Sequence, residues 1–132
     1  MTTPYLLDAN VLIALTITDH EHHDVAARWA ADVHHFALCP ISEGALARFL
    51  IRVGESPATV RAVVSALHAS PRCVFWPDSI SYADAGLDHV IGHRQVTDAY
   101  LVSLAAHHGG TLATFDQGVA SAQPEKVELI SR

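Results

Sequence analysis

The chain has 132 residues, of which 50% are hydrophobic and 17% charged, which suits one compact domain and excludes disordered, coiled-coil and collagen-like proteins. Its apolar runs are far shorter than the roughly 20 residues that cross a membrane, and no basic leader precedes Asp8, so we expect a single cytoplasmic domain over residues 1–132. Fourteen acidic residues against eight basic ones give a net charge of −6, which argues against nucleic-acid binding by overall basicity.

Five short apolar segments are bounded by proline, glycine or polar residues, a pattern typical of buried strands. They cover residues 4–7, 36–39, 73–76, 111–114 and 127–130. Because helical segments alternate with them, they predict an α/β fold with three layers, in which helices cover both faces of a mostly parallel sheet.

The segments between these strands carry apolar residues at three- and four-residue spacings, the pattern of amphipathic helices. In chain order, we expect helices over residues 11–17, 24–33, from 41 onward, 57–70, 79–90 and 96–107. Asn10 is a candidate N-cap for the first helix, and Ser56, followed by Pro57, is one for the fourth. Residues 92–95 are expected to form a loop.

Four acidic residues lie near the carboxyl ends of the expected strands. Asp8 follows the first strand, Glu43 lies in the opening turn of the helix after the second, and Asp116 comes just after the fourth. Asp98 lies in the first turn of the helix that leads into the fourth strand. Since ligand sites in open α/β sheets form beyond the carboxyl ends of the strands, all four acids can converge at that edge.

Each acid also has a simpler interpretation. Glu43 and Asp98 would stabilise the positive ends of helix dipoles, and Asp116 fits a turn. Asp8 is harder to explain, because a lone carboxylate buried beside the sheet core loses its hydration. Four carboxylates at one edge would repel one another, and a hard cation such as Mg²⁺ or Mn²⁺, which prefers oxygen ligands, would relieve that repulsion. When these four negative charges are left out of the count, the rest of the chain has a net charge of −2 instead of −6 and is close to neutral.

Four segments, in this order along the chain, resemble the PIN-domain ribonucleases and, within them, the VapC-type toxins of bacterial toxin–antitoxin pairs. The segments are LDANVLI (7–13), SEGALARF (42–49), VTDAYL (96–101) and GTLATFD (110–116). The resemblance spans nearly the whole chain, although residues 57–92 match only in their general helix–strand pattern. It implies a PIN-like three-layer domain with about five short strands, and a metal-dependent endoribonuclease toxin that hydrolyses RNA phosphodiester bonds.

The resemblance also implies roles for particular residues. The catalytic, metal-binding quartet would be Asp8, Glu43, Asp98 and Asp116, with Mg²⁺ as cofactor and Mn²⁺ as a substitute. Asp8 and Asp98 would be the most direct ligands. Four further residues would brace these acids or contact the RNA substrate: Asn10, Thr114, Arg94 and Arg48. For Asn10 a helix cap, and for the arginines ordinary solvated side chains, are the simpler interpretations. The implied partners are a cognate VapB-type antitoxin and a second copy of the chain in a homodimer.

Other functions fit the sequence less well. Ten histidines and two cysteines lack the HExxH and CxxC spacings of zinc sites, so we expect Cys39 and Cys73 to be free, buried thiols. A receiver domain needs a lysine after a late strand, whereas Lys126 precedes the last one. A phosphatase of the haloacid dehalogenase type needs a second acid two residues after the first, where this chain has Asn10. The alternatives that stay open are a catalytically inactive PIN-like module that binds RNA or a protein, and a nuclease that cuts structured DNA.

Overall fold

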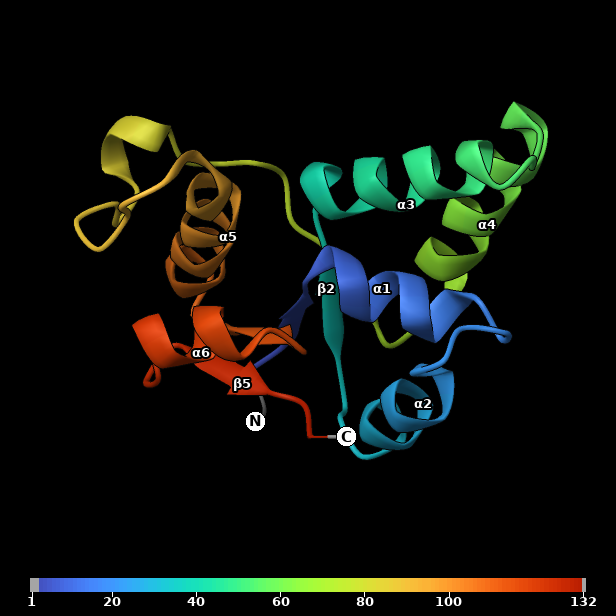
Figure 1. Ribbon diagram of the computed structural model, residues 1–132. Helices are drawn as coiled ribbons and strands as arrows, with labels where there is room; N and C mark the ends of the chain where they lie inside the picture. The colour runs from blue at the N-terminus through green and yellow to red at the C-terminus, as the bar shows by residue number, and fades with distance from the viewer. Residues whose placement is uncertain (1–2, 132) are drawn as a thin grey trace.

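The computed structural model describes residues 3–131, which form a five-stranded sheet with helices on both faces (Figure 1). The strands are β1 (Tyr5–Leu7), β2 (Phe36–Leu38), β3 (Cys73–Phe75), β4 (Thr111–Thr114) and β5 (Val127–Leu129). Their order in the sheet is β3-β2-β1-β4-β5, and every neighbouring pair is parallel. The structure therefore confirms the parallel sheet and places each predicted strand to within one residue.

The helices are α1 (Ala9–Thr16), α2 (His23–Ala31), α3 (Pro40–Arg52), α4 (Pro57–Ala69), α5 (Val96–His107) and α6 (Gln117–Ala122). Helix α4 begins as predicted, because the Ser56 hydroxyl accepts a hydrogen bond from the Thr59 amide (3.1 Å) and Pro57 lies in the first turn. Helix α5 has the predicted bounds. It ends before Gly109, whose φ of 75° lies in the left-handed region that favours glycine.

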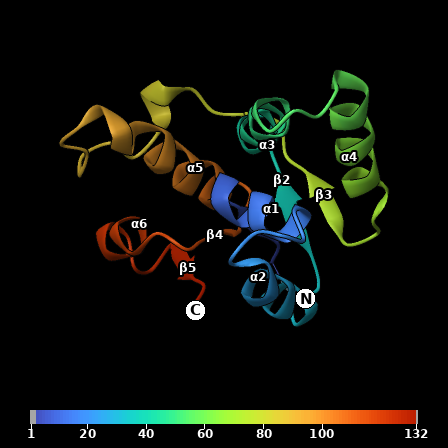
Figure 2. The ribbon, with the colours of Figure 1, turned by 45° about the vertical axis from the view of Figure 1, so that its right-hand side comes forward.

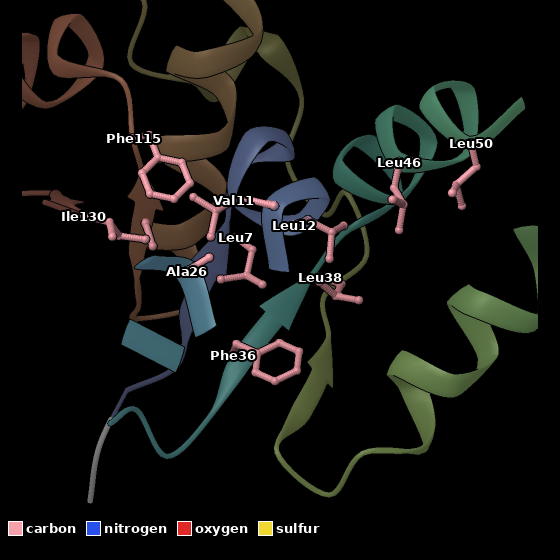
Figure 3. Packing of buried hydrophobic residues seen from close by; sticks show 12 residues of the cluster. Leu7, Val11, Leu12, Ala26, Phe36, Leu38, Leu46, Leu50, Phe115 and Ile130 are labelled. Carbon is pink, nitrogen blue, oxygen red and sulfur yellow. The ribbon is translucent and has the colours of Figure 1, made fainter. Parts of the chain in front are cut away.

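Successive residues of each strand point to opposite faces of the sheet, so that the sheet divides two apolar clusters. Leu7 of β1 belongs to the cluster formed with α1, α2, α3 and α4 (Figure 3). Leu6 belongs to the cluster formed with α5 and α6. In both ribbon views α5 and α6 accordingly lie on one side of the strands and α3 and α4 on the other (Figures 1 and 2). This is the three-layer α/β/α arrangement expected from the sequence.

The predicted helix over residues 79–90 is wrong. Only residues 82–84 form a short 3₁₀ turn, and the rest of the segment is irregular. Side chains of α5 hold this segment in place: the Tyr100 hydroxyl donates to the Ile80 carbonyl (2.8 Å), and the Gly86 amide donates to Ser103 Oγ (2.9 Å). These long-range hydrogen bonds satisfy backbone groups that a helix would have paired internally.

Two smaller predictions also need correction, and one helix was not predicted. Asn10 is not the N-cap of α1; the cap is Asp8, whose carboxylate accepts from the Ala9 amide (2.8 Å). Residues 93–95 of the expected loop form a 3₁₀ turn. The sequence did not predict α6, a six-residue helix that the Asp116 side chain caps.

Two positions show how closely the strands pack against their surroundings. A Cβ atom at Gly110 would lie 2.5 Å from the Pro4 carbonyl oxygen and 2.7 Å from the Trp76 ring, so this position admits only glycine without movement. The Arg72 guanidinium donates to the Ala30 carbonyl and, at 2.5 Å, to the Val33 carbonyl. Arg72 therefore ties the start of β3 to the end of α2.

Both cysteines are free, as predicted; Cys39 is buried and Cys73 is half-buried. Within residues 3–131, no helix has both the length and the apolar character that crossing a membrane requires.

Candidate active site at the carboxyl edge of the sheet

The central strands bring two of the predicted acids to one edge of the sheet. Strand β1 pairs with β4, with Leu7 opposite Ala113, and the Asp8 amide extends the ladder by donating to the Ala113 carbonyl (3.0 Å). Asp8 therefore lies beside the residues that end β4. Asp116 follows two residues after that strand.

The Asp8 carboxylate is buried, with 6% of the residue exposed. One oxygen accepts from the Ala9 amide (2.8 Å) and the other from Thr114 Oγ1 (2.7 Å). Burial raises the pKa of Asp8, the two hydrogen bonds lower it, and the charge of Asp116 raises it further. The net effect is a pKa above the ordinary value, which marks a carboxylate held in a poorly solvated, negative environment.

Asp98, in the first turn of α5, lies in a similar environment. Burial raises its pKa, and the charges of Asp8 and Asp116 raise it further, to about 6. Asp8, Asp98 and Asp116 are separated by up to 108 positions in sequence, yet the charge of Asp116 acts on Asp8 and the charges of both act on Asp98. We refer to these three residues as the acidic cluster.

Thr114 joins two members of the acidic cluster. Its hydroxyl donates to Asp8 Oδ2 and accepts from the Asp116 amide (3.1 Å). The Asp116 carboxylate in turn accepts from the amides of Gly118 (2.8 Å) and Val119 (3.2 Å), which makes Asp116 the N-cap of α6. Asp8 and Asp116 both begin a helix, so their backbones are fixed by the helices that they cap.

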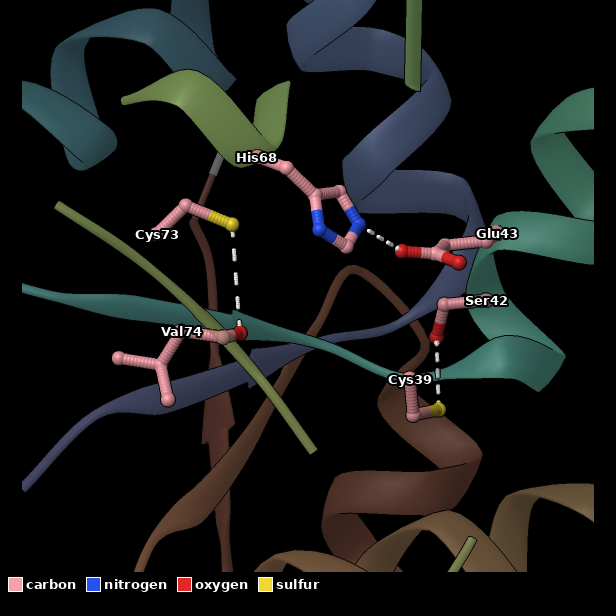
Figure 4. A network of polar contacts seen from close by, with 6 residues as sticks. All are labelled: Cys39, Ser42, Glu43, His68, Cys73 and Val74. Carbon is pink, nitrogen blue, oxygen red and sulfur yellow. Dashed lines mark hydrogen bonds and ion pairs between the residues drawn. The ribbon is translucent and has the colours of Figure 1, made fainter. Parts of the chain in front are cut away.

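Glu43, the fourth predicted acid, is paired differently. Nε2 of His68, in the last turn of α4, donates to its carboxylate over 2.5 Å (Figure 4). The charge of Glu43 acts on Cys73 at the start of β3, where it adds to the effect of burial in raising the pKa of the thiol. It is not among the charges that raise the pKa of Asp98, which are those of Asp8 and Asp116. The structure therefore brings three of the four acids into one cluster and directs Glu43 toward α4 and β3.

The backbone next to Glu43 is nevertheless anchored to β1. The Ser42 side chain is fully buried, and its hydroxyl donates to the Leu7 carbonyl (2.8 Å), one residue before Asp8. Sequence reasoning missed both Ser42 and His68. The position of Ser42 directly before a predicted acid was the available signal, whereas nothing local pointed to His68.

Two hollows flank the acidic cluster, and Asp116 lines both. The larger, of about 750 Å³, is lined by Asn10, Phe115, Asp116, Gln117, Gly118, Leu129, Ile130 and Ser131. The smaller, of about 220 Å³, includes Asp98, Arg94 and His89 among its lining residues. Arg94 is exposed and lines the smaller hollow together with Asp98 and Asp116.

Two predicted residues, Arg48 and Asn10, make no hydrogen bond to the acidic cluster among the described residues. Arg48 is exposed on α3, with its guanidinium close to Gly44, and lines neither hollow. Among the hydrogen bonds of residues 3–131, none joins the Asn10 side chain to Asp8. Asn10 is instead exposed at the larger hollow.

The acidic cluster offers a metal ion only oxygen ligands. Within residues 3–131, no three His, Cys, Asp or Glu side chains already stand at ligand distances from a common point. Mg²⁺ does not require such a group, because it keeps several waters and is commonly bound through one or two carboxylates together with substrate phosphates. Burial is the main cause that raises the pKa of Asp98 to about 6, and the charges of Asp8 and Asp116 add to it. A divalent cation would offset the charge repulsion.

Residues 5–123 match the PIN domain, and the chain therefore belongs to the PIN-domain family. Among its relatives are VapC ribonucleases of Mycobacterium tuberculosis. It is 53% identical over 127 residues to Ribonuclease VapC29, covering 95% of each chain, and 39% identical over 136 residues to Ribonuclease VapC39, covering 95% of this chain and 98% of the relative. The VapC-type resemblance seen in the sequence motifs is thus confirmed.

A solved structure supports the fold independently. The crystal structure of Mycobacterium tuberculosis VapC20, described as a sarcin-ricin loop cleaving toxin, matches with a TM-score of 0.71 at 16% identity. The match covers 96% of this chain and 99% of that one. At this identity the likeness establishes the shared fold.

Proposed function

We propose that this VapC-type protein is a Mg²⁺-dependent endoribonuclease, with Mn²⁺ as a substitute, and that it hydrolyses RNA phosphodiester bonds at the acidic cluster. The observation that carries the proposal is the convergence of three acids, which follow β1, begin α5 and follow β4: Thr114 joins Asp8 to Asp116, and burial together with the charges of Asp8 and Asp116 raises the pKa of Asp98 to about 6. Strongly perturbed acids in a cleft are candidates for function, and the VapC ribonucleases of M. tuberculosis are relatives along almost the whole chain.

Asp8, Asp98 and Asp116 would hold the ion. A bound divalent cation lowers the pKa of a coordinated water and offsets the charge that develops on a phosphoryl oxygen. The chain's own residues supply the positioning: Thr114 fixes the orientation of Asp8, and the amides of Gly118 and Val119 fix that of Asp116. Glu43, held by His68, stays a predicted ligand that acts through water or a second ion.

Arg94 would neutralise an RNA phosphate at the smaller hollow, where it lies with Asp98 and Asp116. An arginine is suited to this role because its guanidinium is always charged and binds phosphate oxygens through two parallel hydrogen bonds. The net charge of −6 makes such local neutralisation necessary.

The test is cleavage of RNA with Mg²⁺ or Mn²⁺ and with EDTA, comparing the native chain, Asp98→Asn and Asp84→Asn. Asp84 is an exposed acid in the 82–84 turn and serves as the matched control. We expect metal-dependent cleavage, a loss of at least about 100-fold in Asp98→Asn, equivalent to about 3 kcal/mol, and no loss in the control. Equal cleavage with EDTA would overturn the metal dependence, and RNA binding without cleavage would favour the non-catalytic module.

The VapC relatives also support a cognate antitoxin as partner and RNA as substrate for this chain. Co-expression with its cognate antitoxin should suppress cleavage and yield a complex that co-purifies. The homodimer is a further part of the proposal, and the molar mass of the purified protein in solution tests it.

A further inference from the structure

We propose that the larger hollow, on the Asn10 side of Asp116, binds an unpaired nucleobase of the RNA next to the bond that is cut. The inference rests on the proposed function and adds a specificity-determining subsite to it. Its basis is the difference in chemistry between the two hollows that share Asp116.

The lining of the larger hollow suits a neutral ligand. None of its eight lining residues is a lysine, arginine or histidine, and Asp116 is its single charged residue. Among these lining residues, a phosphate would meet a carboxylate and no cationic side chain. The smaller hollow has Arg94 and His89, so the backbone phosphates have their partner on that side of Asp116.

The polar groups of the larger hollow match the edge of a base. Asn10 and Gln117 present amides, each with a donor and an acceptor, and Ser131 adds a hydroxyl. Asparagine and glutamine read bases through paired hydrogen bonds to their edges, and sequence-specific RNA recognition mostly takes splayed-out, unpaired bases. Both amides belong to exposed residues and can therefore reach such a base.

The apolar groups provide a surface for the face of the base. Phe115 and Ile130 are 7% and 4% exposed and form a fixed floor, whereas Leu129 is 37% exposed and can contact a ligand. The volume of about 750 Å³ lies within the range of about 300–1,000 Å³ typical of small-molecule sites, which is large enough for a base with its ribose.

The position of the two amides is tied to the acidic cluster. Gln117 is the residue after Asp116, the cap of α6, and Asn10 is the second residue after Asp8, the cap of α1. Each amide is therefore held within the first turn of a helix that one of the acids caps. A base held by these amides would fix which phosphodiester lies at the acidic cluster.

The test uses Gln117→Met, which keeps the length of the side chain and removes its hydrogen bonds, and Asn10→Ala. Ser121→Ala, on the same short helix as Gln117 but outside both hollows, is the control. Short unstructured RNAs that contain one cut site, with each of the four bases in turn at the flanking positions, are cleaved with Mg²⁺. Binding of the same fluorescein-labelled RNAs is measured in EDTA with each substitution combined with Asp98→Asn.

We expect the native chain to prefer one base at a position flanking the cut. Gln117→Met should raise KM about 5- to 10-fold, as expected for loss of one or two hydrogen bonds, leave kcat within about twofold, and abolish the preference. In EDTA, Gln117→Met should weaken RNA binding by the same factor of about 5 to 10. Ser121→Ala should match the native chain in both assays. Unchanged preference and binding in both variants, or no preference in the native chain, would overturn the subsite. Absence of cleavage with unaltered, base-selective binding in EDTA would overturn the nuclease and leave the subsite standing.

Discussion

Replacing Asp98 by asparagine should stabilise the metal-free protein while removing its activity. The pKa of Asp98 in the folded chain is about 6, against an ordinary value of 3.8. Folding thus favours the protonated form, and the ionised form opposes folding. The difference corresponds to at most about 3 kcal/mol once the carboxyl is fully ionised. Solvent screening at this half-buried residue reduces it to about 1–2 kcal/mol.

The pH dependence gives the sign of this effect. Near pH 4 Asp98 is protonated in the folded chain, so asparagine and aspartic acid are nearly equivalent. As the pH rises from about 4 to above 6, Asp98 ionises and the native chain loses about 1–2 kcal/mol of its free energy of unfolding, whereas Asp98→Asn does not. At about pH 7.5 the variant should therefore melt roughly 3–8 °C higher in EDTA, taking a few degrees per kcal/mol for a chain of this size.

The measurement is thermal unfolding of both proteins in EDTA across this pH range, followed by the same scans with Mg²⁺. Mg²⁺ should raise the Tm of the native chain, because a ligand that binds only the folded state stabilises it, and should raise that of Asp98→Asn much less. A variant no more stable than the native chain at neutral pH, or a difference that shrinks as the pH rises, would refute the electrostatic reasoning.

Three further predictions concern other residues. Thr114→Val removes the hydrogen bond to Asp8 within a buried site, so it should cost about 1–3 kcal/mol and raise the Mg²⁺ concentration needed for half-maximal cleavage; an unchanged metal requirement would contradict this role. Gly110→Ala should lower the free energy of unfolding by at least about 2 kcal/mol, measured by urea denaturation, whereas Gly92→Ala, in open space, should change it by less than about 0.5 kcal/mol. Arg72→Met should cost about 1–3 kcal/mol because it leaves two carbonyls without their donor, and equal stability by the same assay would show that water replaces it.

The sequence was most informative where local pattern and sheet geometry coincide. Asp8 directly follows an apolar strand, and Asp116 follows another. The rule that parallel strands end at one edge was therefore enough to place them together. The place of Asp98 in the first turn of α5 could be predicted because the sequence shows this helix clearly, down to its end before Gly109.

Features that depend on tertiary contacts could not be predicted in this way. The partner of Glu43 is His68, 25 positions away, and the packing of α4 against α3 decides that pairing. Residues 79–90 have a composition compatible with a helix, but Tyr100 and Ser103 hold them in an irregular path. Helix α6 has only six residues, too few for a periodic pattern to emerge.

The central position of β1 has a consequence for the synthesis of the protein. Its partner on one side, β4, begins at residue 111 of 132, so the middle of the sheet closes only when most of the chain has left the ribosome. The acidic cluster requires Asp116 and forms no earlier. Under the proposed function, a nascent or prematurely terminated polypeptide that stops before residue 111 would therefore lack both β4 and Asp116 and could not cut the RNA of the cell that makes it.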